Sequence, residues 1–148
     1  MARVSGTPGK TRALNVYRMP DCYLVDLPGY GFAHAAKSDR VGFQRLLTTA
    51  LKRRPLHGVV WLLDIRRDPS PDDLRFRALM AERRVPLLAV LTKTDKLGYE
   101  QGMRRAREVG DALELDPDKL LATSSVSGLG IAQLGEELLA AARSPQAR

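Results

Sequence analysis

Three short segments of this sequence carry side chains suited to holding a nucleotide, and each follows a run that predicts a β-strand. The first is Asp26-Leu27-Pro28-Gly29. Its carboxylate can hold Mg²⁺ through water, and its glycine amide can approach a phosphate without a side chain in the way. The same four residues form an ordinary turn, and on their own they favour that simpler interpretation.

The second segment is Thr92-Lys93-Thr94-Asp95, directly after an apolar run. The carboxylate of Asp95 can accept hydrogen bonds from the ring N–H and the amino group of guanine, a pair that adenine does not offer. The stem of Lys93 can lie along the base. An exposed loop before a helix would use the same residues, but the apolar run in front of it favours the guanine site.

The third segment, Thr123-Ser124-Ser125, has small side chains, so that a backbone N–H can reach the guanine carbonyl oxygen. Alone it is only a polar loop. All three segments stand at the carboxyl ends of expected strands, where parallel sheets bind their ligands. In this order they predict a guanine-nucleotide site.

The elements that must position these segments alternate between strands and helices. The expected strands are 13–19, 22–27, 58–64, 86–91 and 120–123, and the expected helices are 38–54, 71–83, 99–113 and 131–142. Ser38 and Ser70 are the expected N-caps, with Pro71 at a first helical position. The unbroken apolar run 58–64 predicts a strand buried on both faces. The fold class is therefore α/β, with a mostly parallel sheet and helices on both faces.

The composition is that of one globular domain. The chain has 148 residues, 44% of them hydrophobic, and a net charge of +7. No apolar run approaches the roughly 20 residues that cross a membrane, so we expect no membrane span and a cytoplasmic location. The single cysteine, Cys22, excludes an internal disulfide. The positive charge favours a polyanionic partner such as RNA, although a basic surplus also serves solubility.

With these motifs the sequence resembles the EngB (YihA) family of bacterial ribosome-biogenesis GTPases over nearly its whole length. The resemblance rests on Thr7-Pro8-Gly9-Lys10-Thr11, the run from Tyr23 to Gly31, Gly58-Val59-Val60, Leu63-Asp64-Ile65-Arg66, the run from Leu91 to Lys96, and Ser124-Ser125. It implies a P-loop GTPase-like domain over residues 1–148 that binds GTP or GDP with Mg²⁺. It also implies a role in assembly of the large ribosomal subunit, in contact with that subunit or its rRNA, and in cell division and septation.

The resemblance also implies roles for single residues. Thr11 would be the switch I threonine that ligates Mg²⁺, with Gly9 and Lys10 beside the nucleotide. The segment 26–29 would sense the γ-phosphate. Thr92, Lys93, Thr94 and Asp95 would form the guanine site, supported by Thr123, Ser124 and Ser125. Tyr30 stands where many GTPases have a water-positioning glutamine, so we expect it to pack against the sheet and intrinsic hydrolysis to be slow.

The sequence has no G-x-x-x-x-G-K-[ST] motif, whose amides and lysine hold the β- and γ-phosphates. The nearest segment has Val4 at the first glycine position, and Pro8 has no N–H, so we interpret it as switch I. We expect a strand–loop–helix unit of about 30 or more residues to precede this sequence. The alternative is a relative that no longer binds nucleotide tightly. Without this motif the 148-residue chain should bind GTP weakly or not at all. We also expect it to be partly disordered or self-associating, because the strands ending at Asp26 and Asp64 would lack the strand between them.

Two other function classes compete with the GTPase. One is a non-enzymatic RNA- or ribosome-binding module derived from the same fold. The other is a P-loop ATPase using Lys10 and Thr11, which the Thr-Lys-Thr-Asp segment disfavours. Runs of basic residues could contact rRNA phosphates or simply be solvated: Lys52-Arg53-Arg54, Arg66-Arg67, Arg83-Arg84 and Arg104-Arg105. The sequence leaves the oligomeric state open.

Overall fold

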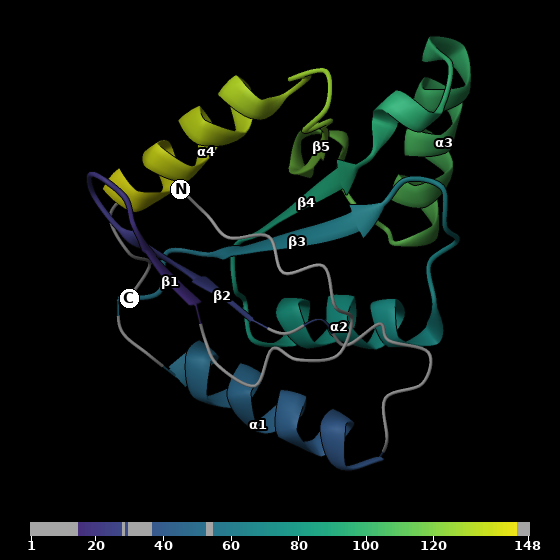
Figure 1. Ribbon diagram of the computed structural model, residues 1–148. Helices are drawn as coiled ribbons and strands as arrows, with labels where there is room; N and C mark the ends of the chain where they lie inside the picture. The colour runs from purple at the N-terminus through teal and green to yellow at the C-terminus, as the bar shows by residue number, and fades with distance from the viewer. Residues whose placement is uncertain (1–14, 28, 30–36, 53–54, 145–148) are drawn as a thin grey trace. The chain divides into compact units, whose positions relative to one another are not determined.

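The computed structural model describes residues 15–27, 29, 37–52 and 55–144, with the side chains of residues 37–40 excepted. Its contacts divide the chain into two compact units, Met1–Arg54 and Pro55–Arg148. Each unit is described on its own below. The ribbon in Figure 1 labels the helices and strands.

The N-terminal unit contains a β-hairpin and one helix. Strands β1 (Asn15–Arg18) and β2 (Tyr23–Asp26) pair antiparallel, as the sequence predicts, although both are shorter than expected. The helix α1 spans Lys37–Lys52. The expected N-cap at Ser38 is therefore wrong: Ser38 lies inside the helix, whereas an N-cap residue has a non-helical backbone.

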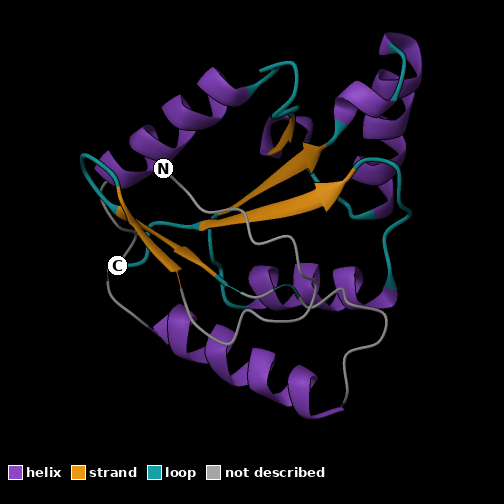
Figure 2. Cartoon of the chain, in the orientation of Figure 1, coloured by secondary structure: helices purple, strands orange, loops and turns teal. Residues whose placement is uncertain are grey.

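The C-terminal unit is built on a parallel sheet in the order β3-β4-β5 (Figure 2). Its strands are β3 (Val59–Asp64), β4 (Leu87–Thr92) and β5 (Leu120–Ala122). The register places Asp64 beside Thr92, and Leu91 beside Ala122. The residues that follow all three strands therefore meet along one edge of the sheet. This parallel arrangement confirms the expected α/β class.

Three helices and two short 3₁₀ turns complete this unit. The elements are α2 (Pro71–Glu82), η1 (Thr94–Lys96), α3 (Tyr99–Ala112), η2 (Pro117–Lys119) and α4 (Ile131–Arg143). The expected N-cap Ser70 is confirmed: its Oγ accepts the Asp73 amide at 3.2 Å, and the Asp73 carboxylate accepts the Ser70 amide at 2.7 Å. This reciprocal capping box fixes the start of α2. None of the described helices is long and apolar enough to cross a membrane.

The buried apolar residues of this unit come from the sheet and from α2 and α3, among them Met80 and Val109. Helices α2 and α4 lie on opposite sides of the sheet (Figure 1). The rings of Trp61 and Phe76 pack with their centroids 5.0 Å apart. Leu62, the next residue along β3, faces the other way and remains 64% exposed, so the expectation that β3 is buried on both faces is wrong there. Its neighbours on that face are Ile131 and Leu134 of α4, which line a hollow with it instead of filling the space.

Candidate functional site

The predicted site residues divide between the two units. Gly9, Lys10, Thr11 and Pro28 lie outside the described residues, as does Tyr30. Asp26 ends β2 in the N-terminal unit, where the Asn15 amide donates to its carboxylate at 3.4 Å, and Leu27 and Gly29 follow it. The predicted phosphate and Mg²⁺ contacts of this unit therefore stay predictions. The residues predicted to bind the base all lie in the C-terminal unit.

The two threonines of the Thr-Lys-Thr-Asp segment tie it to the neighbouring strands. The Thr92 hydroxyl donates to the Leu63 carbonyl oxygen at 3.1 Å. The Thr94 hydroxyl and amide both donate to the Thr123 carbonyl oxygen, at 2.9 and 3.3 Å. Between them Lys93 takes a left-handed backbone, with φ 63° and ψ 32°, which turns the chain from β4 into η1. These bonds hold the segment in one place at the sheet edge.

Asp95 is oriented by Ser124. The Ser124 hydroxyl, fully buried, donates to Asp95 Oδ1 at 2.6 Å, and Lys96 Nζ lies 3.4 Å from Oδ2. The Ser124 hydrogen bond, followed by that of Lys96, holds the pKa of Asp95 below its usual range despite the opposing effect of desolvation. Each carboxylate oxygen has two lone pairs, so Asp95 keeps accepting capacity. It is therefore an ionised acceptor at neutral pH, as guanine recognition requires.

The backbone N–H groups of the Thr123-Ser124-Ser125 segment differ in whether they already donate a hydrogen bond. The Thr123 N–H donates to the Leu91 carbonyl oxygen at 2.7 Å, and the Ser124 N–H donates to the Leu129 carbonyl oxygen at 3.0 Å. Within the described part of the chain, the Ser125 N–H has no hydrogen-bond acceptor. It is thus the amide of this segment that can donate to a guanine carbonyl oxygen.

A hollow of about 370 Å³ joins these segments. Four of its lining residues belong to the two predicted base-binding segments: Thr92, Lys93, Thr123 and Ser125. The others come from β3, β4 and α4: Leu62, Val90, Ile131 and Leu134. The structure therefore brings the two segments to one concave surface, with an apolar wall on one side and polar groups at the sheet edge.

A glycine turn holds the third segment against α4. Gly130 has φ 68°, and a Cβ there would collide with the Ala122 carbonyl oxygen. Gly128 also has a positive φ, 80°. Both positions favour glycine, because other residues rarely adopt this backbone. The expected Gly-containing turn at 127–130 is confirmed, and it brings α4 close to the end of β5.

Sequence reasoning gave no role to Asp64, yet this residue contacts the predicted site. Lys93 Nζ lies 3.0 Å from Asp64 Oδ2. Arg66 donates to the same carboxylate from Nε at 2.9 Å, from Nη2 at 2.7 Å and from its backbone N–H at 3.1 Å. These bonds, those of Arg66 foremost, hold the pKa of Asp64 well below its usual range. A carboxylate at the end of a parallel strand beside β4 is the signal that could have found it.

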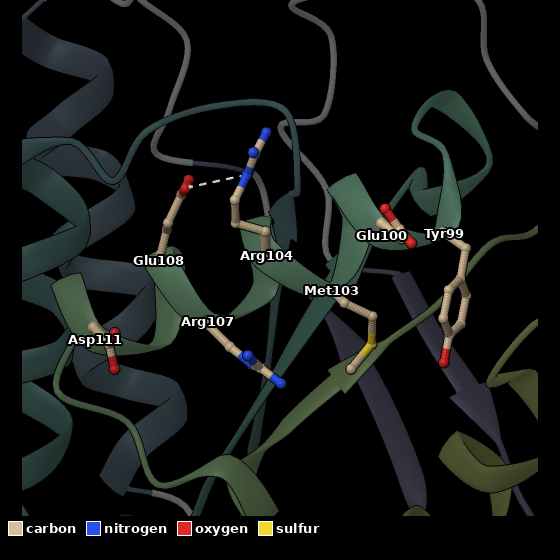
Figure 3. A pocket seen from close by; sticks show the side chains of 7 residues that line it. All are labelled: Tyr99, Glu100, Met103, Arg104, Arg107, Glu108 and Asp111. Atoms are coloured by element: carbon tan, nitrogen blue, oxygen red, sulfur yellow. Dashed lines mark ion pairs between the residues drawn. The ribbon is translucent and has the colours of Figure 1, made fainter.

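A second hollow, of about 450 Å³, lies along α3 and contains none of the predicted site residues (Figure 3). Its lining is Tyr99, Glu100, Met103, Arg104, Arg107, Glu108 and Asp111. Arg104 and Glu108, one turn apart on α3, form an ion pair at 3.7 Å. All of these residues lie on one helix or at its start, so the hollow is an open groove without a second wall.

The fold is that of the P-loop GTPases. The crystal structure of a probable GTP-binding protein EngB superposes with a TM-score of 0.74 at 17% identity, covering 89% of this chain and 84% of that one. Era in complex with MgGDPNP and nucleotides 1506–1542 of 16S ribosomal RNA superposes with a TM-score of 0.71 at 20% identity, covering 98% of this chain and 49% of that one.

Sequence similarity identifies the family within this fold class. A family model described as 50S ribosome-binding GTPase matches residues 1–93. The probable GTP-binding protein EngB of Alkaliphilus metalliredigens is 40% identical over 137 residues, which are 90% of this chain and 66% of that protein. That of Listeria welshimeri is 35% identical over 133 residues, 88% of this chain and 69% of that protein. The chain belongs to the EngB family of GTP-binding proteins, and it spans about two thirds of the length of these relatives.

Proposed function

We propose that this chain binds guanine nucleotides at the carboxyl edge of β4 and β5 and acts as a GTPase switch in assembly of the large ribosomal subunit. The observation that carries the proposal is the 2.6 Å hydrogen bond from Ser124 to Asp95, which orients an ionised carboxylate two residues after Lys93, a residue that lines the hollow. Roles in cell division and septation and a cytoplasmic location belong to the same proposal, on the strength of the family resemblance.

Each base-binding residue has one role in this proposal. Asp95 accepts the ring N–H and amino group of guanine, and the Ser125 amide donates to the base carbonyl oxygen. The stem of Lys93, which lines the hollow, lies along the base. Thr92, Thr94, Thr123 and Ser124 hold these three groups in position. Adenine lacks the matching donors and acceptor, so the site discriminates between the two purines.

The phosphate and Mg²⁺ contacts are proposed from the family resemblance, with Mg²⁺ neutralising charge on the phosphates. Mg²⁺ usually takes one or two carboxylates together with phosphate oxygens and waters. Asp26, whose carboxylate is exposed at the end of β2, fits a single carboxylate partner of this kind. Gly9, Lys10, Thr11, Leu27, Pro28 and Gly29 complete the proposed set.

The proposed macromolecular partner is the large ribosomal subunit or its rRNA. The net charge of +7 supports a polyanionic partner, because basic side chains displace the counterions of phosphate groups. Arg83 and Arg84 are both exposed after α2 and are suited to such contacts. The structural neighbour Era was crystallised with a segment of 16S rRNA, which supports RNA contact on this fold.

A titration of the ¹⁵N-labelled full chain with GDP and Mg²⁺ tests the nucleotide site. We expect saturable shifts in the amides of Asp95 and Ser125 with GDP, and no saturable change there with ADP, the matched control. The affinity should be weak, because the sequence has no G-x-x-x-x-G-K-[ST] motif. Equal responses to GDP and ADP, or shifts confined to other surfaces, would contradict the proposal.

A second candidate is a ribosome-binding module in which nucleotide plays little part, and the same positive charge favours it. Co-sedimentation with purified large subunits distinguishes the two. A switch should bind with an affinity that differs between GTP and GDP. A module of the second kind should bind equally with either nucleotide and without any.

A further inference from the structure

Asp64 stands at the meeting point of β3 and the Thr-Lys-Thr-Asp segment. The sheet register pairs Asp64 with Thr92, so the next residue, Lys93, begins directly beside the carboxylate. Lys93 Nζ donates to Asp64 Oδ2 at 3.0 Å. This contact joins the lysine proposed to lie along the base to a residue that the proposed base-binding set does not include.

The carboxylate of Asp64 is itself held in place. Its side chain is 14% exposed, and the planar guanidinium of Arg66 donates to both of its oxygens, at 2.9 and 2.7 Å. Such two-point contacts fix the plane of a carboxylate as well as its position. Oδ2 therefore faces Lys93 from a defined direction.

Lys93 needs such an anchor. Its side chain is 54% exposed, and a lysine stem has four rotatable bonds whose freedom is lost on ordering. The backbone of Lys93 is already fixed in the left-handed region, so its side chain is the part that still needs ordering. An anchor at Nζ orders the stem before a base arrives.

We infer that Asp64 is a positioning residue for Lys93, which it holds by the ammonium so that the stem lies ready along the wall of the hollow. Arg66 acts one step further away, by orienting Asp64. The inference rests on the proposed guanine site. It assigns Asp64 no contact with the nucleotide.

The test is a double-mutant cycle on the full chain, with GDP and Mg²⁺ as the ligand. Asp64→Asn should weaken GDP binding about two- to fivefold, the range expected for one partly exposed ion pair. In a Lys93→Ala background the same substitution should have no further effect, because the group that Asp64 positions is gone. Asp68→Asn is the matched control: Asp68 is an exposed carboxylate nearby that pairs with Arg105, and its loss should leave GDP binding unchanged.

A nucleotide-free measurement separates positioning from general stability. ¹³C relaxation of the Lys93 ε-carbon should report a more mobile side chain in Asp64→Asn than in the wild type or Asp68→Asn. Thermal melts of the same samples show whether the fold is retained. If Lys93 is equally mobile in all three, the inference is wrong.

Two outcomes of the cycle also overturn it: unchanged GDP affinity in Asp64→Asn, or an equal loss in the Lys93→Ala background. The proposed function fails separately, if Asp95→Asn leaves GDP binding unchanged or the wild type does not distinguish GDP from ADP. The inference then fails with it. Weakened binding in Asp95→Asn together with unchanged binding in Asp64→Asn refutes the inference alone.

Discussion

The Ser124 hydroxyl donates to Asp95 Oδ1 at 2.6 Å and joins two loops that are 29 residues apart in the chain. The parallel register of β4 and β5 makes this contact possible, because it brings the ends of both strands to the same level. The bond ties the acidic side chain of one loop to the loop that carries the Ser125 amide. In the proposed site, base recognition would therefore depend on both loops.

Replacing the carboxylate of Asp95 should change which purine the site prefers. In Asp95→Asn the acceptor for the guanine ring N–H is lost, and the amide offers a donor instead, which complements xanthine. We expect GDP affinity to fall about ten- to a hundredfold and preference to move toward xanthosine diphosphate. Titration with both nucleotides checks this, with the exposed Asp118→Asn as control. Unchanged preference would remove Asp95 from the guanine site.

Adding one methyl group at Gly130 should destabilise the C-terminal unit. Alanine there would hold an unfavourable φ of 68° and meet the Ala122 carbonyl oxygen. We expect Gly130→Ala to lower the free energy of unfolding by about 2–3 kcal/mol. Urea denaturation, followed by the fluorescence of Trp61, measures it, since the sequence has one tryptophan.

Gly135 provides the matched control for that variant, because it lies within α4 and a Cβ there would meet nothing within 4 Å. Gly135→Ala should be neutral or raise stability by up to about 1 kcal/mol. Equal effects of the two substitutions would contradict the role assigned to the turn.

Asp64 should make stability depend on pH in the acid range. Arg66 first, and then Lys93, hold the pKa of this carboxyl below the ordinary value of 3.8. A carboxyl whose pKa is lower in the folded state stabilises the fold above its unfolded pKa, and this contribution is lost as the pH falls below it. The difference in unfolding free energy between wild type and Asp64→Asn should therefore be largest above about pH 5 and shrink below pH 4. Urea denaturation across this range checks it, and a constant difference would contradict it.

Leu62 should promote self-association. It is an exposed apolar residue on β3, and within the described residues β3 has a strand neighbour on one side only. An exposed edge strand can pair with a strand of another chain, and a lysine on the edge strand discourages this association. Leu62→Lys should lower the mean mass measured by light scattering. Leu74→Lys, on helix α2, is the control for an exposed leucine away from a strand edge. A monomeric wild type would refute this prediction.

The sequence predicted the order and type of the elements well, because local signals carry them. The Ser70–Pro71 start of α2 and the apolar runs of β3 and β4 depend on neighbouring residues alone. Leu62 was mispredicted because its burial depends on how far a helix distant in the chain covers the sheet. Periodicity within β3 contains no such information.

Residue type alone suggested which side chains form the proposed site, but not how they pair with one another. The acidic residue of the Thr-Lys-Thr-Asp segment suggested a base acceptor, yet its partner Ser124 and the contact of Lys93 with Asp64 depend on strand register. The left-handed backbone of Lys93 was equally hidden, since lysine has no preference for it. Both features arise from tertiary structure.

The buried hydroxyl of Ser124 has a second structural role. Besides donating to Asp95, its Oγ accepts the amides of Val126 and Ser127, at 3.2 and 3.1 Å, which uses its one donor and both lone pairs. Loss of this hydroxyl would therefore disturb the backbone turn at 124–127 as well as Asp95. A substitution of Lys93, whose side chain is 54% exposed, would leave all three of these hydrogen bonds in place.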